Sequence, residues 1–167
     1  MKVNLKRLKT RPEAREAFSF VFDDFDSNWK ELAEDFLDPV QLDLIIENTG
    51  KVYRGKGHLK TTVQLLCGRC VKAFAFPIVS ELDISMVEDD YSQDCNHVED
   101  FIVFSGDEVD ITARVQEQIF LSIPMNPLCS LECKGLCPIC GNDKNTGNCS
   151  CEEREIDPRW EKLKNLI

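Results

Sequence analysis

Apolar and polar residues alternate along much of the chain, which is the pattern of β-strands that bury one face and expose the other. The period of two runs through four stretches, residues 18–22, 40–46, 52–65 and 71–86. Val3, Leu5 and Leu8 indicate a further short strand or anchoring contact in an otherwise polar surface segment, and Phe101–Phe104 a short apolar strand. The first half of the chain is therefore expected to be mostly sheet.

Turn residues separate the three longest of these stretches. Asn48–Lys51 joins the first to the second, and Cys67–Cys70 joins the second to the third, which predicts successive antiparallel hairpins. Gly55 and Gly57 interrupt the middle strand, and isolated glycines in a strand indicate a bulge or a bend.

Three segments have a helical spacing of apolar residues instead. A short helix is expected from about 28 to 37, capped by Ser27 or Asn28 and stopped by Pro39. A second is capped by Asp107 or Asp110 and ends at Pro124. A third opens at Asp157. The apolar face of the second helix is expected to consist of Ile111, Val115, Ile119, Phe120 and Ile123.

These elements predict an α+β fold. We expect an antiparallel sheet, open or closed into a barrel, with the 111–123 helix packed on one face. The domain boundary is expected at 126: residues 1–126 form the α+β domain with a basic N-terminal arm, and residues 127–167 form a cysteine-rich zinc-binding segment with a C-terminal helix. A hydrophobic content of 43% is typical of a folded protein.

Charge is unevenly distributed along the chain. The net charge is −10, and no Lys or Arg lies between Lys72 and Arg114, where acidic residues gather. Such a balance weighs against a surface that binds phosphates everywhere. Bases concentrate instead at the N-terminus, where the expected RNA-binding residues are Lys2, Lys6, Arg7, Lys9 and Arg11. The acidic middle could meet a basic protein.

Six of the nine cysteines fall between Cys129 and Cys151, a density that points to a bound metal ion. Cys137-Pro-Ile-Cys140-Gly has the form of a metal knuckle: two intervening residues let both sulfurs face one ion, and the glycine allows the turn. Zinc is favoured, because it accepts tetrahedral thiolate coordination without redox demands. An iron–sulfur cluster and reduced structural thiols are the alternatives.

The remaining ligands are left open by the spacing. Cys129, Cys133, Cys149 and Cys151 compete for the other positions, with one of Cys149 and Cys151 favoured over both, because a Cys-x-Cys pair reaches one metal only with a bend. A second possible pair is Cys67 and Cys70, which could ligate metal or exchange disulfides. Cys95 lies alone in an acidic loop and is expected to take no part.

An enzyme would need more than metal. His58 and His97, the only histidines, lie far from the cysteine-rich segment in sequence, so no catalytic residue is expected. The first residues have no apolar signal-peptide core, and no run of 18 uncharged apolar residues follows, which favours a cytoplasmic protein without membrane contact. A reducing compartment keeps thiols free for metal.

Several motifs, in their order along the chain, resemble the YceD family of large-subunit ribosomal RNA accumulation proteins. They are Cys67–Cys70 before an aromatic strand, Val109–Ile111 leading into Leu121–Met125, the segment Cys133–Gly141 that contains the knuckle, and Asp157–Trp160 with Leu163. The resemblance runs from about Leu42 to the end, although Asn142–Asn145 replaces the family's usual Asn-Leu-Asn. It implies a bacterial or organellar cytosolic factor for large-subunit RNA, without known catalytic residues.

The first hypothesis is accordingly a non-enzymatic ribosome-assembly factor with a structural zinc site. Its expected partner is a ribosomal RNA precursor or a basic ribosomal protein, and no small-molecule substrate is expected. A thiol or metal enzyme that uses Cys67 and Cys70 is one alternative. A zinc-ribbon regulator that binds nucleic acid is another, and the isoelectric point of about 4.7 disfavours it.

Overall fold

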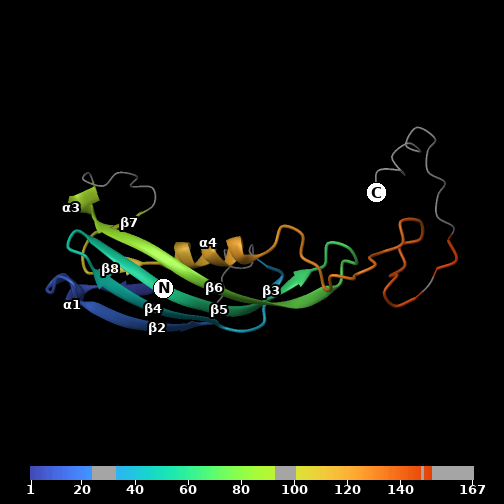
Figure 1. Ribbon diagram of the computed structural model, residues 1–167, viewed down its shortest axis with the longest axis horizontal. Helices are drawn as coiled ribbons and strands as arrows, with labels where there is room; N and C mark the ends of the chain where they lie inside the picture. The colour runs from blue at the N-terminus through green and yellow to red at the C-terminus, as the bar shows by residue number, and fades with distance from the viewer. Residues whose placement is uncertain (24–32, 93–100, 148, 152–167) are drawn as a thin grey trace.

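The computed structural model describes residues 1–23, 33–92, 101–147 and 149–151. Their strands are β1 (Lys2–Asn4), β2 (Arg15–Phe22), β3 (Asp35–Phe36), β4 (Val40–Asn48), β5 (Val52–Leu66), β6 (Ala73–Glu88), β7 (Phe101–Phe104) and β8 (Glu108–Asp110). Their helices are α1 (Lys6–Lys9), α3 (Asp89–Ser92) and α4 (Thr112–Ser122). The chain is a mixed α+β protein dominated by its sheet, and Figure 1 shows an elongated molecule with the cysteine-rich segment at one end.

The main sheet has the strand order β2-β4-β5-β6-β7, and β3 pairs with β5 beside this path. The pairs among β2, β4, β5 and β6 are antiparallel, as the alternation predicts. Strand β7 instead runs parallel to the end of β6, so the sheet is mixed. In the described residues β2 and β7 are separate edges, which shows that the sheet is open and that closure into a barrel was the wrong alternative.

The two glycines of β5 do not form the expected bulge. Strand β5 keeps one continuous register with both neighbours, with Gly57 opposite Leu44 and Gly55 opposite Ile46. A Cβ atom on Gly57 would lie 2.2 Å from the backbone oxygen of Asp43, and one on Gly55 would lie 2.7 Å from Ile84 Cγ1. The glycines therefore serve close approach of neighbouring strands and side chains.

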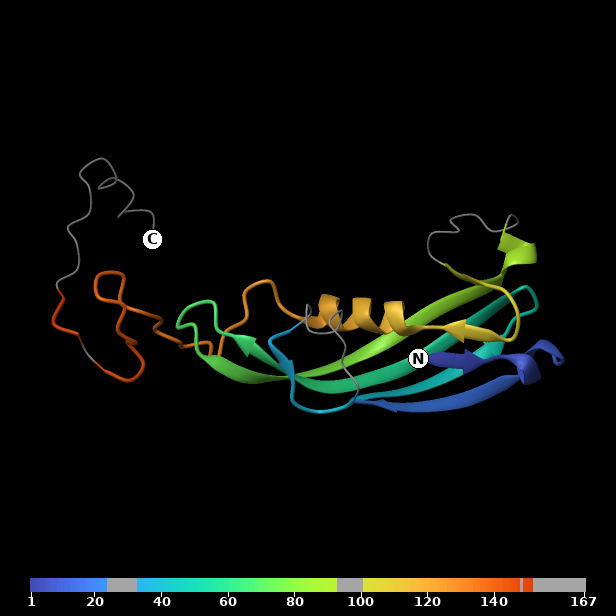
Figure 2. The same ribbon diagram turned by 180° about the vertical axis from the view of Figure 1, so that it is seen from behind.

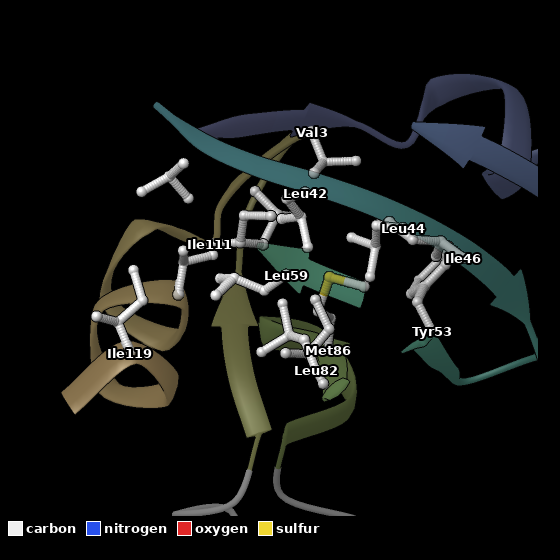
Figure 3. Packing of buried hydrophobic residues seen from close by; sticks show 14 of the residues in the cluster. Val3, Leu42, Leu44, Ile46, Tyr53, Leu59, Leu82, Met86, Ile111 and Ile119 are labelled. Atoms are coloured by element: carbon white, nitrogen blue, oxygen red, sulfur yellow. The ribbon is translucent and has the colours of Figure 1, made fainter. Parts of the chain in front are cut away.

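The apolar core lies between the inner face of the main sheet and a second layer formed by α4 and the small β1–β8 sheet (Figures 2 and 3). Figure 3 shows Leu42, Leu59 and Met86 from the sheet meeting Ile111 and Ile119 from the other layer. Each of these side chains is at most 1% exposed. Gln118 of α4 also donates a hydrogen bond to Ser80 Oγ of β6 at 2.6 Å, which fixes the helix over the sheet.

The expectation for α4 was largely correct. The expected cap was wrong, because Ile111 is the N-cap residue and no side chain caps the helix there. Asp110 precedes it and accepts a hydrogen bond from the backbone N–H of Thr112 at 2.9 Å. Val115 and Ile119 are buried and Ile123 is partly buried against the core, but Phe120 is 60% exposed and does not belong to the apolar face. Phe120 lies one position beyond Ile119, which turns it away from the sheet.

The first predicted helix is wrong at its end, and the last lies outside the described residues. Asp35–Phe36 forms strand β3 against β5, so the helix expected at 28–37 was wrong at its end, and residues 28–32 lie outside the described part of the chain. Pairing with the stretch of β5 that lies beyond the end of β4 overrides the local helical spacing there. The helix expected from Asp157 also falls outside the described residues.

The N-terminal segment is anchored rather than laid loosely over the surface. Val3, Leu5 and Leu8 are each at most 1% exposed and join the core, so the predicted anchoring contact is confirmed. Strand β1 pairs with β8, which confirms the short strand as well. Within the described residues, no helix is long and apolar enough to cross a membrane.

Candidate metal centres at the cysteine-rich end

The described cysteines gather into two groups of four, and we call them the first and second clusters. The first cluster joins Cys67 and Cys70 to Cys129 and Cys133. The second joins Cys137, Cys140, Cys149 and Cys151. In each group the sulfur atoms all lie within 4.8 Å of one another, so each could hold a metal ion.

The first cluster is built on the turn between β5 and β6, at the far end of the longest hairpin (Figure 1). The backbone N–H of Cys67 donates to the carbonyl of Lys72 at 2.9 Å, and that of Val71 donates to the carbonyl of Cys67 at 2.9 Å. Val71 has φ +58°, a left-handed conformation that closes the turn. This tight turn brings the two sulfurs of the Cys-x2-Cys pair to one side.

The returning chain after α4 supplies the other half of the first cluster. Gly68 N–H donates to the carbonyl of Pro127 at 2.8 Å, which places the approach to Cys129 beside the hairpin turn. Gly68 cannot readily carry a side chain, because a Cβ atom would lie 2.1 Å from Asn126 Oδ1. Cys67, Cys70 and Cys133 are buried, whereas Cys129 is exposed.

The second cluster begins at the knuckle that the sequence predicts. Gly141 N–H donates to the carbonyl of Cys137 at 2.9 Å, and Gly141 adopts φ +75°, the conformation for which the glycine was expected. Cys137 N–H donates to the carbonyl of Asn142 at 2.7 Å. Cys137 is buried and Cys140 exposed, while Cys149 and Cys151 are intermediate.

Direct contacts hold the second cluster against the first. The Arg69 carbonyl accepts a hydrogen bond from Leu136 N–H at 3.1 Å, which joins the knuckle loop to the hairpin turn. Within the first cluster, Arg69 Nη1 donates to the Cys133 carbonyl at 2.9 Å. Lys72 Nζ lies 2.5 Å from Asp143 Oδ2. Asn145 Nδ2 donates to Cys133 Sγ at 3.4 Å. The loop that carries the knuckle is therefore fastened to the hairpin turn and to a cysteine of the first cluster.

Within each cluster, one thiol has a lowered pKa and another has a raised pKa. Hydrogen bonding from the backbone N–H of Cys129 lowers the pKa of Cys67 to about 6, and the backbone N–H groups of Cys140 and Ile139 lower that of Cys137 to about 6. Desolvation of its sulfur by the neighbouring cysteines raises the pKa of Cys129 to about 12, although the residue as a whole is exposed, and a hydrogen bond with Cys140 raises the pKa of Cys151 to about 12. Each cluster thus contains one thiol that ionises readily and another that keeps its proton unless a nearby cation favours the thiolate.

The donor sets fit a tetrahedral thiolate centre. The sulfurs of Cys67 and Cys133 are 3.8 Å apart, and those of Cys70 and Cys129 are 3.7 Å apart. A ZnS₄ tetrahedron with Zn–S bonds of about 2.3 Å has sulfur–sulfur edges of about 3.8 Å. Disulfides are much shorter, at about 2.05 Å, and the described cysteines are free. Among the described residues both groups consist of cysteine alone.

The structure divides the predicted ligands differently from the single shell that the spacing favoured. Cys129 and Cys133 lie with Cys67 and Cys70 rather than with the knuckle, and both sulfurs of Cys149 and Cys151 join the second group. Sequence reasoning missed the supporting contacts of Lys72, Asp143 and Asn145, because a surface lysine or a loop amide carries no periodic signal. Cys95 lies outside the described residues.

The predicted RNA-binding bases are also divided. Lys2, Lys6, Arg7 and Arg11 are exposed on β1, α1 and the turn that follows. Lys9 is instead drawn inward: its Nζ lies 3.3 Å from Glu88 Oε1, 3.7 Å from Asp107 Oδ1 and 5.2 Å from the centre of the Phe104 ring. His58 is exposed on β5, and the described residues place no cysteine cluster around it.

Comparison with known proteins gives consistent similarities. The profile of the family described as large ribosomal RNA subunit accumulation protein YceD matches residues 55–167. The chloroplastic large ribosomal RNA subunit accumulation protein YCED homolog 1 of Arabidopsis thaliana is 26% identical over 155 residues, covering 77% of this chain and 48% of that protein. The uncharacterized protein YlbN of Bacillus subtilis is 34% identical over 107 residues, covering 62% of this chain and 59% of YlbN.

An uncharacterized protein of Mycobacterium tuberculosis is 27% identical over 135 residues, covering 77% of this chain and 62% of that protein. The chain thus spans about half of the Arabidopsis protein and about three fifths of the mycobacterial one. No solved structure matches it.

Proposed function

Since the chain belongs to the YceD family of large ribosomal RNA subunit accumulation proteins, we propose that it is a non-enzymatic factor in large-subunit assembly. The observation that carries the proposal is the family match over residues 55–167, which includes most of the β5–β6 hairpin and all eight described cysteines. The name of the Arabidopsis relative describes the same role. We extend that role to this chain.

Each cysteine cluster is proposed to hold one structural zinc ion. Cys67, Cys70, Cys129 and Cys133 would hold the first, and the four remaining described cysteines the second. Sulfur separations near 3.8 Å support this in the first cluster, and in the second the four sulfurs lie within 4.8 Å of one another. Four thiolates leave no open position of the kind a catalytic zinc keeps. Bound zinc would supply folding free energy to the segment rather than reactivity.

A cytoplasmic setting suits these clusters, because a reducing compartment keeps thiols available for metal. The proposed partner is precursor RNA of the large subunit, reached through the exposed bases near the N-terminus. A basic ribosomal protein on the acidic middle of the chain is the other partner consistent with the charge distribution.

Co-sedimentation tests the proposed role most directly. The full chain is mixed with large-subunit precursor particles and, as a control, with mature subunits, over a series of low to moderate salt concentrations. We expect it to sediment with the precursors and to dissociate as salt rises. The role is wrong if the protein stays unbound at every salt concentration, or if its depletion leaves large-subunit RNA levels unchanged.

Native mass spectrometry tests the metal proposal separately. The expected mass corresponds to two zinc ions per chain, with eight thiols protected from alkylation until a chelator is added. If the purified protein is brown and contains iron and inorganic sulfide, the bound group is an iron–sulfur cluster and the zinc proposal is wrong.

A thiol enzyme is the competing function, and one observation favours it: the backbone N–H of Cys129 lowers the pKa of Cys67 to about 6. Nucleophilic cysteines also need access, however, and Cys67 is 1% exposed. Rapid alkylation of Cys67 in the metal-loaded protein would support the enzyme, whereas alkylation that requires chelation would exclude it.

A further inference from the structure

An open cleft of about 480 Å³ lies between α1 and the start of β2. Three arginines line it, Arg7 from α1, Arg11 from the following turn and Arg15 from the first position of β2, together with Thr10 and Glu16. Figures 1 and 2 place α1 at the opposite end of the molecule from the cysteine-rich segment, so this cleft is separate from both clusters.

The backbone that presents these arginines is fixed by Asn48. Its buried side chain donates from Nδ2 to the Leu8 carbonyl at 2.7 Å, and its backbone pairs with the turn through Glu13 N–H and the Ala14 carbonyl at 2.8 and 3.0 Å. Glu13 adopts φ +64°, a conformation that non-glycine residues rarely take. The turn is therefore held to one shape, which limits the entropy lost when a ligand binds.

Three arginines around one cleft are notable on a chain of net charge −10. Arg15 Nη2 lies 3.1 Å from Glu47 Oε1, and Arg7 Nη1 lies 3.6 Å from Glu16 Oε1. Their side chains are 68% and 89% exposed, and such exposed ion pairs are weak enough to exchange for a ligand. Arg11 makes no ion pair with the described residues. Planar guanidinium groups match phosphate oxygens through paired hydrogen bonds.

Glu16 indicates that a ligand of the cleft should also carry a hydrogen-bond donor. Its Oε2 atom is buried and has no hydrogen-bond partner among the described residues, although it lies beside arginines. A buried acceptor without a donor is costly, so a ligand that offers a hydroxyl or amine next to its phosphate would satisfy it. In RNA the ribose 2′-hydroxyl is always adjacent to a phosphate, whatever the base. DNA lacks that donor.

We propose that this cleft binds the sugar–phosphate backbone of single-stranded RNA, with Arg7, Arg11 and Arg15 on phosphates and Glu16 accepting from a 2′-hydroxyl. The proposal rests on the proposed function and deepens it, since it states where and how the chain contacts RNA. It also changes the set of residues expected to bind RNA. Arg15 and Glu16 are added to Arg7 and Arg11, and Lys2, Lys6 and Lys9 are no longer included.

Fluorescence anisotropy with a labelled single-stranded ribooligonucleotide tests the arginines in the full chain. Arg7→Gln and Arg11→Gln should each weaken binding about tenfold, as the loss of one charge-assisted contact implies, and each should lower the salt slope by about one unit. Lys6→Gln is the matched control, because it removes the same charge from exposed α1 but does not line the cleft. It should change affinity less than about twofold. Equal losses in all three variants would overturn the cleft.

Glu16→Ala tests the sugar contact in the same assay, with DNA of the same sequence as the second ligand. The wild-type chain should prefer RNA, and the variant should lose that preference while its affinity for DNA stays equal or rises. An RNA preference that survives the substitution would show that Glu16 does not contact the ribose. Competition with adenosine monophosphate adds a third readout, and displacement at equal concentration would assign the cleft to a free nucleotide instead.

The two proposals fail separately. If the wild-type chain sediments with precursor particles but binds no isolated RNA, the cleft is wrong and the assembly role stands. If the arginine variants lose RNA while depletion leaves large-subunit RNA levels unchanged, the assembly role is wrong and the cleft stands. Thermal unfolding of the Arg7, Arg11 and Lys6 variants should match wild type, because these side chains are exposed.

Discussion

The two ends of the molecule are ordered by different means. In the sheet end, Leu42, Leu59 and Met86 are at most 1% exposed and pack in a continuous apolar core. In the cysteine-rich end, several large apolar side chains are exposed: Leu131 is 90% exposed and Ile139 46%. The side chains buried there are sulfurs, with Cys133 and Cys137 each 4% exposed. Burial of hydrocarbon stabilises the first end, and the second needs another source of free energy.

Chelation should give the largest difference between the two ends. Removing the proposed zinc ions should leave the amides of Leu136, Cys137 and Gly141 without hydrogen-exchange protection, while those of Leu42 and Leu59 keep theirs. The physical reason is that the proposed metal ions would supply folding free energy to the cysteine-rich end only. Residue-resolved hydrogen exchange before and after chelation measures both. Equal protection of the cysteine-rich amides in the two states would contradict the comparison.

Cysteine substitutions should show that the clusters depend on each other unequally. Cys149→Ser should remove one ion and leave the first cluster loaded, because the hairpin turn holds that cluster independently. Cys70→Ser should remove the first ion and also weaken the second, because Arg69, Lys72 and Cys133 anchor the knuckle loop. Metal content after dialysis against a weak chelator is the measurement. Identical losses in the two variants would mean that the contacts between clusters carry no coupling.

Leu59→Ala should act on the sheet end alone. Deleting a side chain that is 0% exposed should lower the free energy of unfolding by about 2–5 kcal/mol. Urea denaturation measures this, and metal content should not change. Val79→Ala is the control on the other face of the sheet, where the side chain is 74% exposed and the expected change is within about 0.5 kcal/mol.

Tyr53 should give the smallest effect and a pH signature. Burial, and then its hydrogen bond to Glu88 at 3.0 Å, raise the pKa of Tyr53 from 10.0 to about 12. The unfolded chain loses this proton at lower pH than the folded chain, so its contribution to stability is present below pH 10.0 and is lost as pH rises toward about 12. Tyr53→Phe should cost about 1 kcal/mol at neutral pH.

Absorbance of the tyrosinate ion tests this in a Tyr91→Phe background, where Tyr53 is the remaining tyrosine. One transition near pH 12 is expected, provided that the protein is still folded there. A transition at pH 10 in folded protein would show that Tyr53 is not held as the structure indicates.

The long strands were predictable because their alternation is a direct image of one buried face. Phe18 to Phe22 and Leu42 to Ile46 follow it closely, and Ile78 to Met86 follows it except at Ser80. The pairing partners of these strands follow from the short turns. Strand β3 and the parallel pairing of β7 were not predictable. Both depend on which part of the sheet still has an unpaired strand backbone where the chain returns. The register at Gly57 depends on the approach of Asp43, which no local pattern records.

For the candidate site, the knuckle Cys137–Cys140 was predictable because its spacing alone fixes the geometry. The grouping of Cys129 and Cys133 with Cys67 and Cys70 was not, since it depends on how α4 returns the chain to the hairpin turn. Only part of the arginine cleft was predictable from the sequence. Arg7 and Arg11 stood out by charge, but Arg15 belongs to a strand and joins them only because Asn48 folds the turn back.

The distance in sequence across the first cluster sets an order of events during synthesis. Cys70 and Cys129 are 59 residues apart, and Cys67 and Cys133 are 66 apart. Contacts of such range form late in folding, because the intervening chain must first be ordered. A ribosome must therefore release β6, β7 and α4 before this cluster can close. Metal uptake at the hairpin turn would mark a chain whose sheet is already assembled.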